Sequence, residues 1–181
     1  MSLTARFMLL LFLPASLGLL AQIVGRGGLD QQLLALALLL ICVEQARMAV
    51  VDLEQIALVK DQIYDSRLSN FHKITTSTII LELLGFYSSS ISLGWGAVLV
   101  LLSQVWFNLL AGIQLQPLGK VAIQPSAISE RLPVLIANGI GLILVSLWLL
   151  QVAPLSMASG LLGLVIFYIW VKYAPAVLKV K

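Results

Sequence analysis

Six apolar stretches of bilayer length constrain the fold of this chain more than any other feature. An α-helix needs about 20 apolar residues to cross the roughly 30 Å hydrocarbon layer of a membrane. The stretches are continuous rather than alternating, which favours helices over a membrane β-barrel. The sequence therefore predicts an all-α polytopic integral membrane protein with about six transmembrane helices, at residues 7–25, 31–51, 74–92, 94–115, 132–151 and 155–173.

The composition excludes an ordinary water-soluble domain. Of the 181 residues, 60% are hydrophobic and 10% are charged, whereas soluble domains carry about 25% charged residues. A soluble fold this apolar would expose large patches and aggregate. We therefore expect one transmembrane domain over residues 1–181, in contact with lipid and without nucleic acid binding. The single cysteine, Cys42, allows neither a disulfide within the chain nor a cysteine-based metal site.

Basic residues are distributed unevenly between the two sides of the predicted bundle. One side carries one basic residue, Arg26, and Arg47 lies inside the second span. The other side carries nine: Arg6, Lys60, Arg67, Lys73, Lys120, Arg131, Lys172, Lys179 and Lys181. The positive-inside rule therefore predicts that both termini are cytoplasmic.

The short loops and the lack of glycosylation motifs suit a bacterial inner membrane or an internal membrane of the thylakoid or organellar type.

The first apolar stretch has two interpretations. Arg6 followed by an apolar run is similar to the charged and apolar regions of a signal peptide. Pro14 interrupts that run, however, and Leu19-Leu20-Ala21 is a poor cleavage site. We expect the first span to be retained, with its cleavage as the alternative.

The second span is predicted to continue beyond the membrane. No glycine or proline interrupts residues 49–64, so the helix would project on the order of 20 Å from the bilayer or bend to lie on its surface. The charged segment 52–73 is the largest cytoplasmic feature and the candidate surface for a partner. Its candidate partner-binding residues are Asp52, Glu54, Lys60, Asp61, Asp65 and Arg67.

Five polar residues of four predicted spans form the candidate ligand site. Ionisable side chains inside a membrane are costly, and they commonly mark functional sites. Counted from the cytoplasmic ends of their spans, all five lie about 6–12 Å deep, in one layer of the inner leaflet. They are Glu44, Arg47, Glu82, Asn108 and Asn138.

This layer has a functional and a structural interpretation. In the first, it surrounds a polar cavity that opens to the cytoplasm and binds a headgroup, an ion or a small solute. In the second, Glu44 and Arg47 pair, Glu82 joins Arg47, and the two asparagines tie helices together. The sequence predicts no catalytic residues and no metal ligands, and it leaves the cofactor unknown.

Pairs of small residues four apart indicate close helix contacts. Ser156 with Gly160, Ser159 with Gly163, and Ala137 with Gly141 let neighbouring helices approach closely. Together with the charged segment and the short outer loops, they favour a non-enzymatic accessory subunit or assembly factor of a larger membrane complex. Its partner would be another membrane protein or a second copy of the chain. The alternative is a small transporter or channel-like protein that uses the polar layer.

The layout of spans also resembles the CDP-alcohol phosphatidyltransferases. Those enzymes carry a D-G-x2-A-R-x8-G-x3-D-x3-D motif at the inner end of the second span. Here Ala46-Arg47 and the pair Asp61 and Asp65 resemble it, as Leu3-Thr4-Ala5-Arg6 resembles the start of the family. Cys42 and Val43 replace the first Asp and Gly, Ile56 replaces the second Gly, and the aspartate pair is one residue out of register. The resemblance implies a degenerate member of this family that lacks the carboxylates that hold the divalent metal. This is the third hypothesis for the function.

Overall fold

The computed structural model describes residues 3–25, 27–62, 65–116 and 122–178, which form six α-helices and one two-stranded sheet. Five of these helices are long and apolar enough to cross a membrane. The described residues therefore form the predicted all-α polytopic membrane fold, with one small β-hairpin added. The elements are α1 (Leu3–Val24), α2 (Leu29–Lys60), α3 (Ser66–Ser89), α4 (Leu93–Leu110), β1 (Ile113–Gln116), β2 (Ala122–Pro125), α5 (Ile128–Leu149) and α6 (Pro154–Leu178).

Helix α3 is the one predicted span that is not apolar enough by itself to cross a membrane. Its 24 residues are long enough, at about 36 Å, but hydroxyl and carboxyl side chains lower its hydropathy. Thr75, Thr78 and Glu82 recur at helical spacing on one face, and all three are buried. The polar face of α3 therefore points into the bundle, where the other helices cover it.

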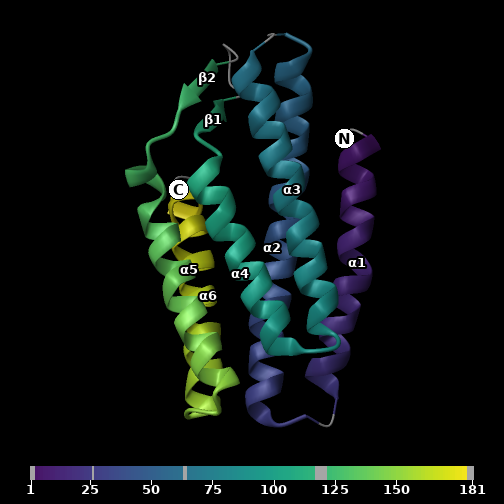
Figure 1. Cartoon of the computed structure of the whole chain (residues 1–181), viewed down its shortest axis with the longest axis vertical. Helices are drawn as coiled ribbons and strands as arrows, with labels where there is room; N and C mark the ends of the chain where they lie inside the picture. Colours follow the sequence, from purple (N-terminus) through teal and green to yellow (C-terminus); the bar gives the residue numbers. More distant parts are fainter. Residues whose placement is uncertain (1–2, 26, 63–64, 117–121, 179–181) are drawn as a thin grey trace.

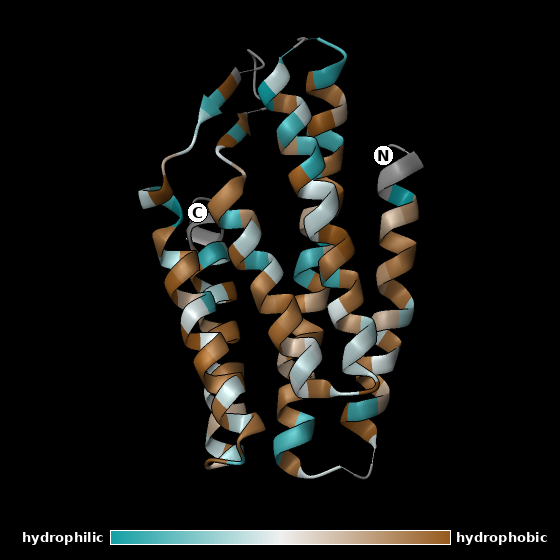
Figure 2. Cartoon of the chain, viewed as in Figure 1, coloured by the Kyte–Doolittle hydropathy of each residue, from teal (hydrophilic) through white to brown (hydrophobic). Residues whose placement is uncertain are grey.

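Five helices form a ring, and the sixth lies outside it. Neighbours around the ring are α2 with α3, α3 with α4, α4 with α5, α5 with α6, and α6 with α2, while α1 packs against α2 and α3 (Figure 1). Helix α2 runs unbroken for 32 residues, or about 48 Å. Its continuation beyond the predicted span is thereby confirmed. Figure 2 shows hydrophilic residues concentrated where α2 and α3 extend past the other helices.

Among the described residues, the basic side chains predicted to be cytoplasmic gather at one end of the bundle, while Lys120, Lys179 and Lys181 lie outside the described part of the chain. Helix α1 begins and α6 ends at this end, which also carries the α2–α3 connection and the β-hairpin (Figure 1). We call it the charged end. The opposite end carries two tight connections, at 90–92 and 150–153, close to those predicted between the third and fourth spans and between the fifth and sixth. In the second of these, Gln151 and Ala153 adopt left-handed backbone angles, with φ of 58° and 44°.

The predicted end of the fourth span is wrong. Residues 111–115 were expected to be helical, but α4 ends at Leu110 and Ile113 starts strand β1. Gly112 has a φ of +58°, a left-handed conformation that commonly ends helices. Strands β1 and β2 then pair antiparallel, with Ile113 opposite Pro125 and Gln116 opposite Ala122.

Small residues allow a close contact between α3 and α4. A side chain at Gly96 of α4 would place its Cβ 2.5 Å from the carbonyl oxygen of Gly85 on α3. This contact holds α3 close to α4 near the end opposite the charged end. The space between the ring helices is wider toward the charged end. A second small cluster of Ile56, Phe71, Ala111 and Ile113 packs under the β-hairpin.

Candidate functional site

A cavity of about 470 Å³ lies inside the ring of helices. Residues of α2, α3, α4, α5, α6 and β1 line it, and it is partly open. The lining residues farthest from the charged end on α4, α5 and α6 are Leu101, Gly141 and Leu161. A Cβ atom at Gly141 would lie 3.3 Å from Leu101 Cδ1 and 3.4 Å from Leu161 Cδ1, so these helices are in close contact where the cavity ends.

Four of the five residues predicted for the polar layer line this cavity. They belong to four different helices and lie at the similar depths that the sequence predicts: Glu44, Glu82, Asn108 and Asn138. Arg47 does not line it, because its side chain lies on the outer side of α2, where it is 46% exposed. Four residues of the predicted layer therefore belong to the wall of one cavity, and Arg47 lies beside it.

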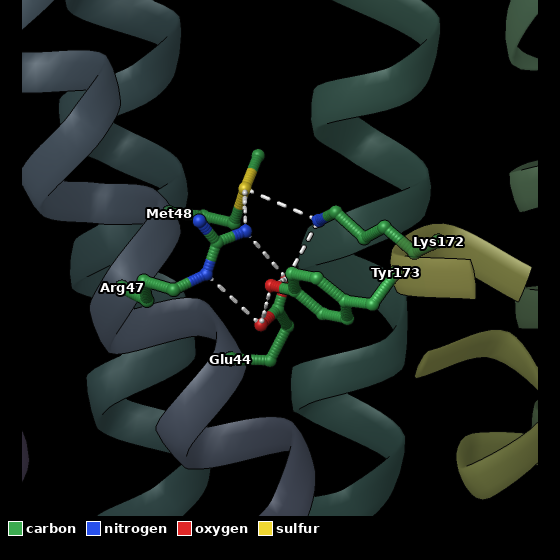
Figure 3. Close-up of polar contacts among 5 residues, drawn as sticks. All are labelled: Glu44, Arg47, Met48, Lys172 and Tyr173. Carbon is green, nitrogen blue, oxygen red and sulfur yellow. Dashed lines mark hydrogen bonds and ion pairs between the residues drawn. The ribbon is translucent and has the colours of Figure 1, made fainter. Parts of the chain in front are cut away.

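Glu44 is the centre of a polar cluster that joins α2 to α6 (Figure 3). Its carboxylate accepts hydrogen bonds from Arg47 Nη2 at 3.0 Å, Lys172 Nζ at 2.6 Å and Tyr173 Oη at 2.8 Å. The Arg47 guanidinium also lies over the Tyr173 ring, 5.3 Å from its centroid. The predicted pairing of Glu44 with Arg47 is confirmed, and the carboxylate is satisfied without a ligand.

Glu82 is in the opposite situation. It is 2% exposed and lines the cavity, and among the described residues no hydrogen bond or ion pair reaches its carboxyl group. The prediction that Glu82 joins Arg47 is wrong, because Arg47 bonds to Glu44 instead. A buried carboxyl group without a cation is unfavourable when charged. Glu82 therefore either carries a proton or receives a positively charged group.

Other buried polar atoms around the cavity also lack partners. Among the described residues, the hydroxyl groups of Thr75 and Thr78 and the side-chain nitrogen of Asn138 are buried without a hydrogen bond. Asn108 donates to the Gln104 carbonyl of its own helix at 2.8 Å, so it does not tie helices together as predicted. Since buried polar groups are normally satisfied, these atoms are unusual for a purely structural wall.

Arg131 connects the β-hairpin to the helices at the charged end of the cavity. Its guanidinium donates to the Ile113 carbonyl at 2.9 Å and to Ser126 Oγ at 3.1 Å, and it lies over the Phe107 ring at 5.6 Å. Ser126 Oγ in turn donates to Glu130 Oε2 at 3.1 Å. The hairpin is thereby held against α4 and α5 beside the cavity.

The predicted partner surface is divided by the structure. Asp52 lines the cavity instead of facing outward, and Glu54 is half-buried, while Lys60 and Asp61 are exposed at the end of α2. Asp65 caps the start of α3 by accepting a hydrogen bond from the Arg67 amide.

Asp65 also forms an ion pair with the Arg67 side chain at 2.7 Å. The side chain and then the backbone amide of Arg67 lower the pKa of the Asp65 carboxyl group.

The residues that a phosphatidyltransferase metal would need do not gather in the described part of the chain. No group of three or more His, Cys, Asp or Glu side chains there could hold a metal ion. Asp61 is exposed at the end of α2, and Asp65 is engaged by Arg67. The described residues therefore do not fit the metal site of those enzymes.

Several residues of the site were not identified as candidates from the sequence. Lys172, Tyr173 and Arg131 lie at span ends, where basic and aromatic residues are expected for orientation alone. Thr75 and Thr78 carry no charge to mark them. A helical face of polar residues that includes Glu82, at positions 75, 78 and 82, was the available signal.

Comparison with known proteins gives no relative. No protein-family profile matches the chain, and no curated protein or solved structure is significantly similar to it.

Proposed function

We propose that this protein is a small membrane transporter or channel-like protein that takes a small solute into the cavity inside its helix ring. One observation carries the proposal. A space of about 470 Å³, the size of small-molecule sites in proteins, lies among helices apolar enough to span a membrane, and its wall holds the unpaired carboxyl group of Glu82. A wall built only for packing would gain from filling this space with apolar side chains.

The positive-inside rule assigns the charged end to the cytoplasm, so the solute would enter from that side. Asp52, Glu130, Arg131 and Lys172 line the cavity toward this end. Their charges keep the opening hydrated, whereas Leu101 and Leu161 close the opposite end in the conformation described.

Cysteine accessibility tests the proposal. In a Cys42→Ala background, we expect Asn138→Cys to react with a small membrane-impermeant thiol reagent in oriented proteoliposomes. A transporter exposes the position first from the charged end and, over time, from the opposite side. Ala97→Cys is the matched control, because Ala97 is fully buried in the packed core outside the cavity.

Two outcomes count against the proposal. Reaction of Asn138→Cys from the charged end alone, however long the exposure, contradicts transport and leaves a one-sided binding site. Lack of reaction from both sides contradicts a solvent-connected cavity altogether.

A second candidate is a subunit of a larger membrane complex, and the surface of α6 favours it. Ser156, Ser159, Gly160 and Gly163 are exposed on this helix, and small residues let a partner helix approach closely. By contrast, Gly141 is packed against Leu101 and Leu161, so that small residue serves internal packing. Purification in a mild detergent tests this candidate: a stoichiometric membrane partner supports it, and a monodisperse monomer opposes it.

A further inference from the structure

The charges of the cavity wall do not balance. Lining carboxyl groups belong to Glu44, Asp52, Glu82 and Glu130, whereas the lining cations are Arg131 and Lys172. Lys172 binds Glu44, and Arg131 binds backbone carbonyl groups and Ser126. Both cations are therefore already engaged, and three acidic side chains remain without a direct ion pair among the described residues: Asp52, Glu82 and Glu130. Of these, Glu130 is exposed and accepts a hydrogen bond from Ser126 Oγ.

The carboxyl groups of Asp52 and Glu82 differ in their surroundings. Asp52 has no direct ion pair among the described residues, but the charges of Lys172, Arg131 and Arg47 act on it favourably. The charge that acts on Glu82 is that of another carboxyl group, Asp52, and it is repulsive. A positive charge placed in the cavity would relieve this repulsion and give the 2% exposed Glu82 its missing partner.

The rest of the wall suits an organic body rather than a bare ion. Ile41, Leu101, Leu161 and Val165 line the cavity beyond the polar layer, and Phe107 and Tyr168 add aromatic rings. Each ring already has a cation of the protein over it, Arg131 at Phe107 and Lys172 at Tyr168, so these rings serve the cavity as apolar surface. No group of three or more metal-ligating side chains gathers among the described residues, and about 470 Å³ exceeds what a single ion fills.

We propose that the cavity selects a small organic cation, with an amine head at Glu82 and an apolar or aromatic body against Leu101, Leu161 and Phe107. The inference rests on the proposed function, because it names the class of solute that the same cavity takes. Thr78 lies one helical turn from Glu82 on α3, and its hydroxyl is unpartnered. It is thereby suited to help position the head group.

A charge series at constant size tests the inference. We would titrate the purified full-length protein in mild detergent with 2-phenylethylamine, the neutral 2-phenylethanol and the anionic 3-phenylpropionate by isothermal calorimetry. The amine is expected to bind at least tenfold more tightly than the alcohol. Glu82→Gln should weaken amine binding at least tenfold, and Asp52→Asn should weaken it less.

Asp61→Asn is the matched control, since it removes the same charge from an exposed position at the end of α2. It should leave amine affinity unchanged. Glu82→Gln keeps the size of the side chain and replaces a buried carboxyl group that has no partner with a neutral amide, so it should fold. Its thermal unfolding midpoint checks this directly.

Three results would overturn the inference. Equal binding of amine and alcohol, unchanged by Glu82→Gln, removes the cation preference but leaves a solute cavity. Tightest binding of the anion assigns recognition to Arg131 and Lys172 instead. Lack of binding of all three probes removes this class of solute, and labelling of Asn138→Cys then decides separately whether the cavity proposal also fails.

Discussion

The Nζ atom of Lys172 lies 2.6 Å from Oε1 of Glu44, and this ion pair joins the end of α6 to the middle of α2. The side chains are 28% and 13% exposed, so solvent screens the pair in part. Because Arg47 and Tyr173 bind the same carboxylate, Glu44 holds three donors that belong to two helices. The side of the ring formed by α2 and α6 therefore depends on one acidic residue.

Loss of this acidic residue should destabilise the protein more than loss of one donor. Glu44→Gln leaves Arg47 and Lys172 near each other without a counter-ion, and we expect it to cost about 1–3 kcal/mol in free energy of unfolding. Lys172→Met should cost less, because Glu44 keeps Arg47 and Tyr173. Unfolding in detergent by SDS titration measures both, with Lys60→Met as the exposed control. Equal stability of Glu44→Gln and the control would contradict this role for Glu44.

A methyl group at Gly96 should separate α3 from α4. The added Cβ would collide with Ser89 Oγ and would lie 2.5 Å from both the Ser89 amide nitrogen and the Gly85 carbonyl oxygen. Since backbone atoms cannot yield, Gly96→Ala is expected to cost about 1–3 kcal/mol, the usual range for overpacking.

Gly139→Ala provides the control for this prediction. No atom lies within 4 Å of a Cβ at that position of α5, so alanine should be neutral or stabilise the helix by about 0.5–1 kcal/mol. Both variants are compared by thermal unfolding in the same detergent. Similar midpoints for the two would show that the close contact between α3 and α4 is not required.

Removal of the Arg131 side chain should loosen the β-hairpin. Arg131→Met loses the hydrogen bonds to the Ile113 carbonyl and Ser126 Oγ, and it loses the cation over the Phe107 ring. We expect at least tenfold faster amide hydrogen exchange in β1 and β2, with little change in the centre of α2. Lys60→Met should leave exchange in the hairpin unchanged. Equal exchange in Arg131→Met and wild type would show that strand pairing alone holds the hairpin.

Protonation of Asp65 should loosen the start of α3. Arg67 lowers the pKa of this carboxyl group in the folded protein, so the Asp65 contribution to stability is present above the unfolded pKa of about 3.9. It is lost as the pH falls through the lower, folded value.

Two substitutions separate the cap from the ion pair at Asp65. Asp65→Asn keeps an N-cap acceptor but loses the charge, whereas Asp65→Ala loses both. Hydrogen exchange in the first turn of α3 is compared with that of Asp65→Asn at each pH from 7 down to about 2, and wild type should approach Asp65→Asn as the pH falls through the folded pKa. A constant difference between wild type and Asp65→Asn across this range would contradict the assigned ionisation.

Hydropathy predicted the helices well because each span is a local property of about 20 residues. The end of α4 was misplaced, because Gly112 can adopt either helical or left-handed angles and the sequence does not say which. The depths of Glu44, Glu82, Asn108 and Asn138 were predictable from helical rise. Because these depths are similar, the four side chains can line the same cavity.

The partners of these side chains could not be predicted in the same way. Rotation of each helix about its axis decides whether Asp52 faces the cavity and whether Lys172 reaches Glu44. That rotation is set by packing between helices that are far apart in sequence, such as α2 and α6. Lys172 and Tyr173 therefore looked like ordinary residues of a membrane interface until the contact of α6 with α2 was known.

Replacement of a cavity hydroxyl should separate stability from binding. The Thr78 hydroxyl is buried without a hydrogen-bond partner, so Thr78→Val, which has nearly the same shape, should stabilise the unliganded protein by about 1 kcal/mol. If the cavity positions an amine at Glu82, the same substitution should weaken 2-phenylethylamine binding severalfold. Natural proteins retain such unfavourable groups mainly where function needs them. Thermal unfolding and calorimetry on one preparation measure both effects, and Ser77→Ala is the control, since the Ser77 hydroxyl bonds to the Ile74 carbonyl of its own helix. A gain in stability without a loss of amine affinity would assign Thr78 no part in recognition.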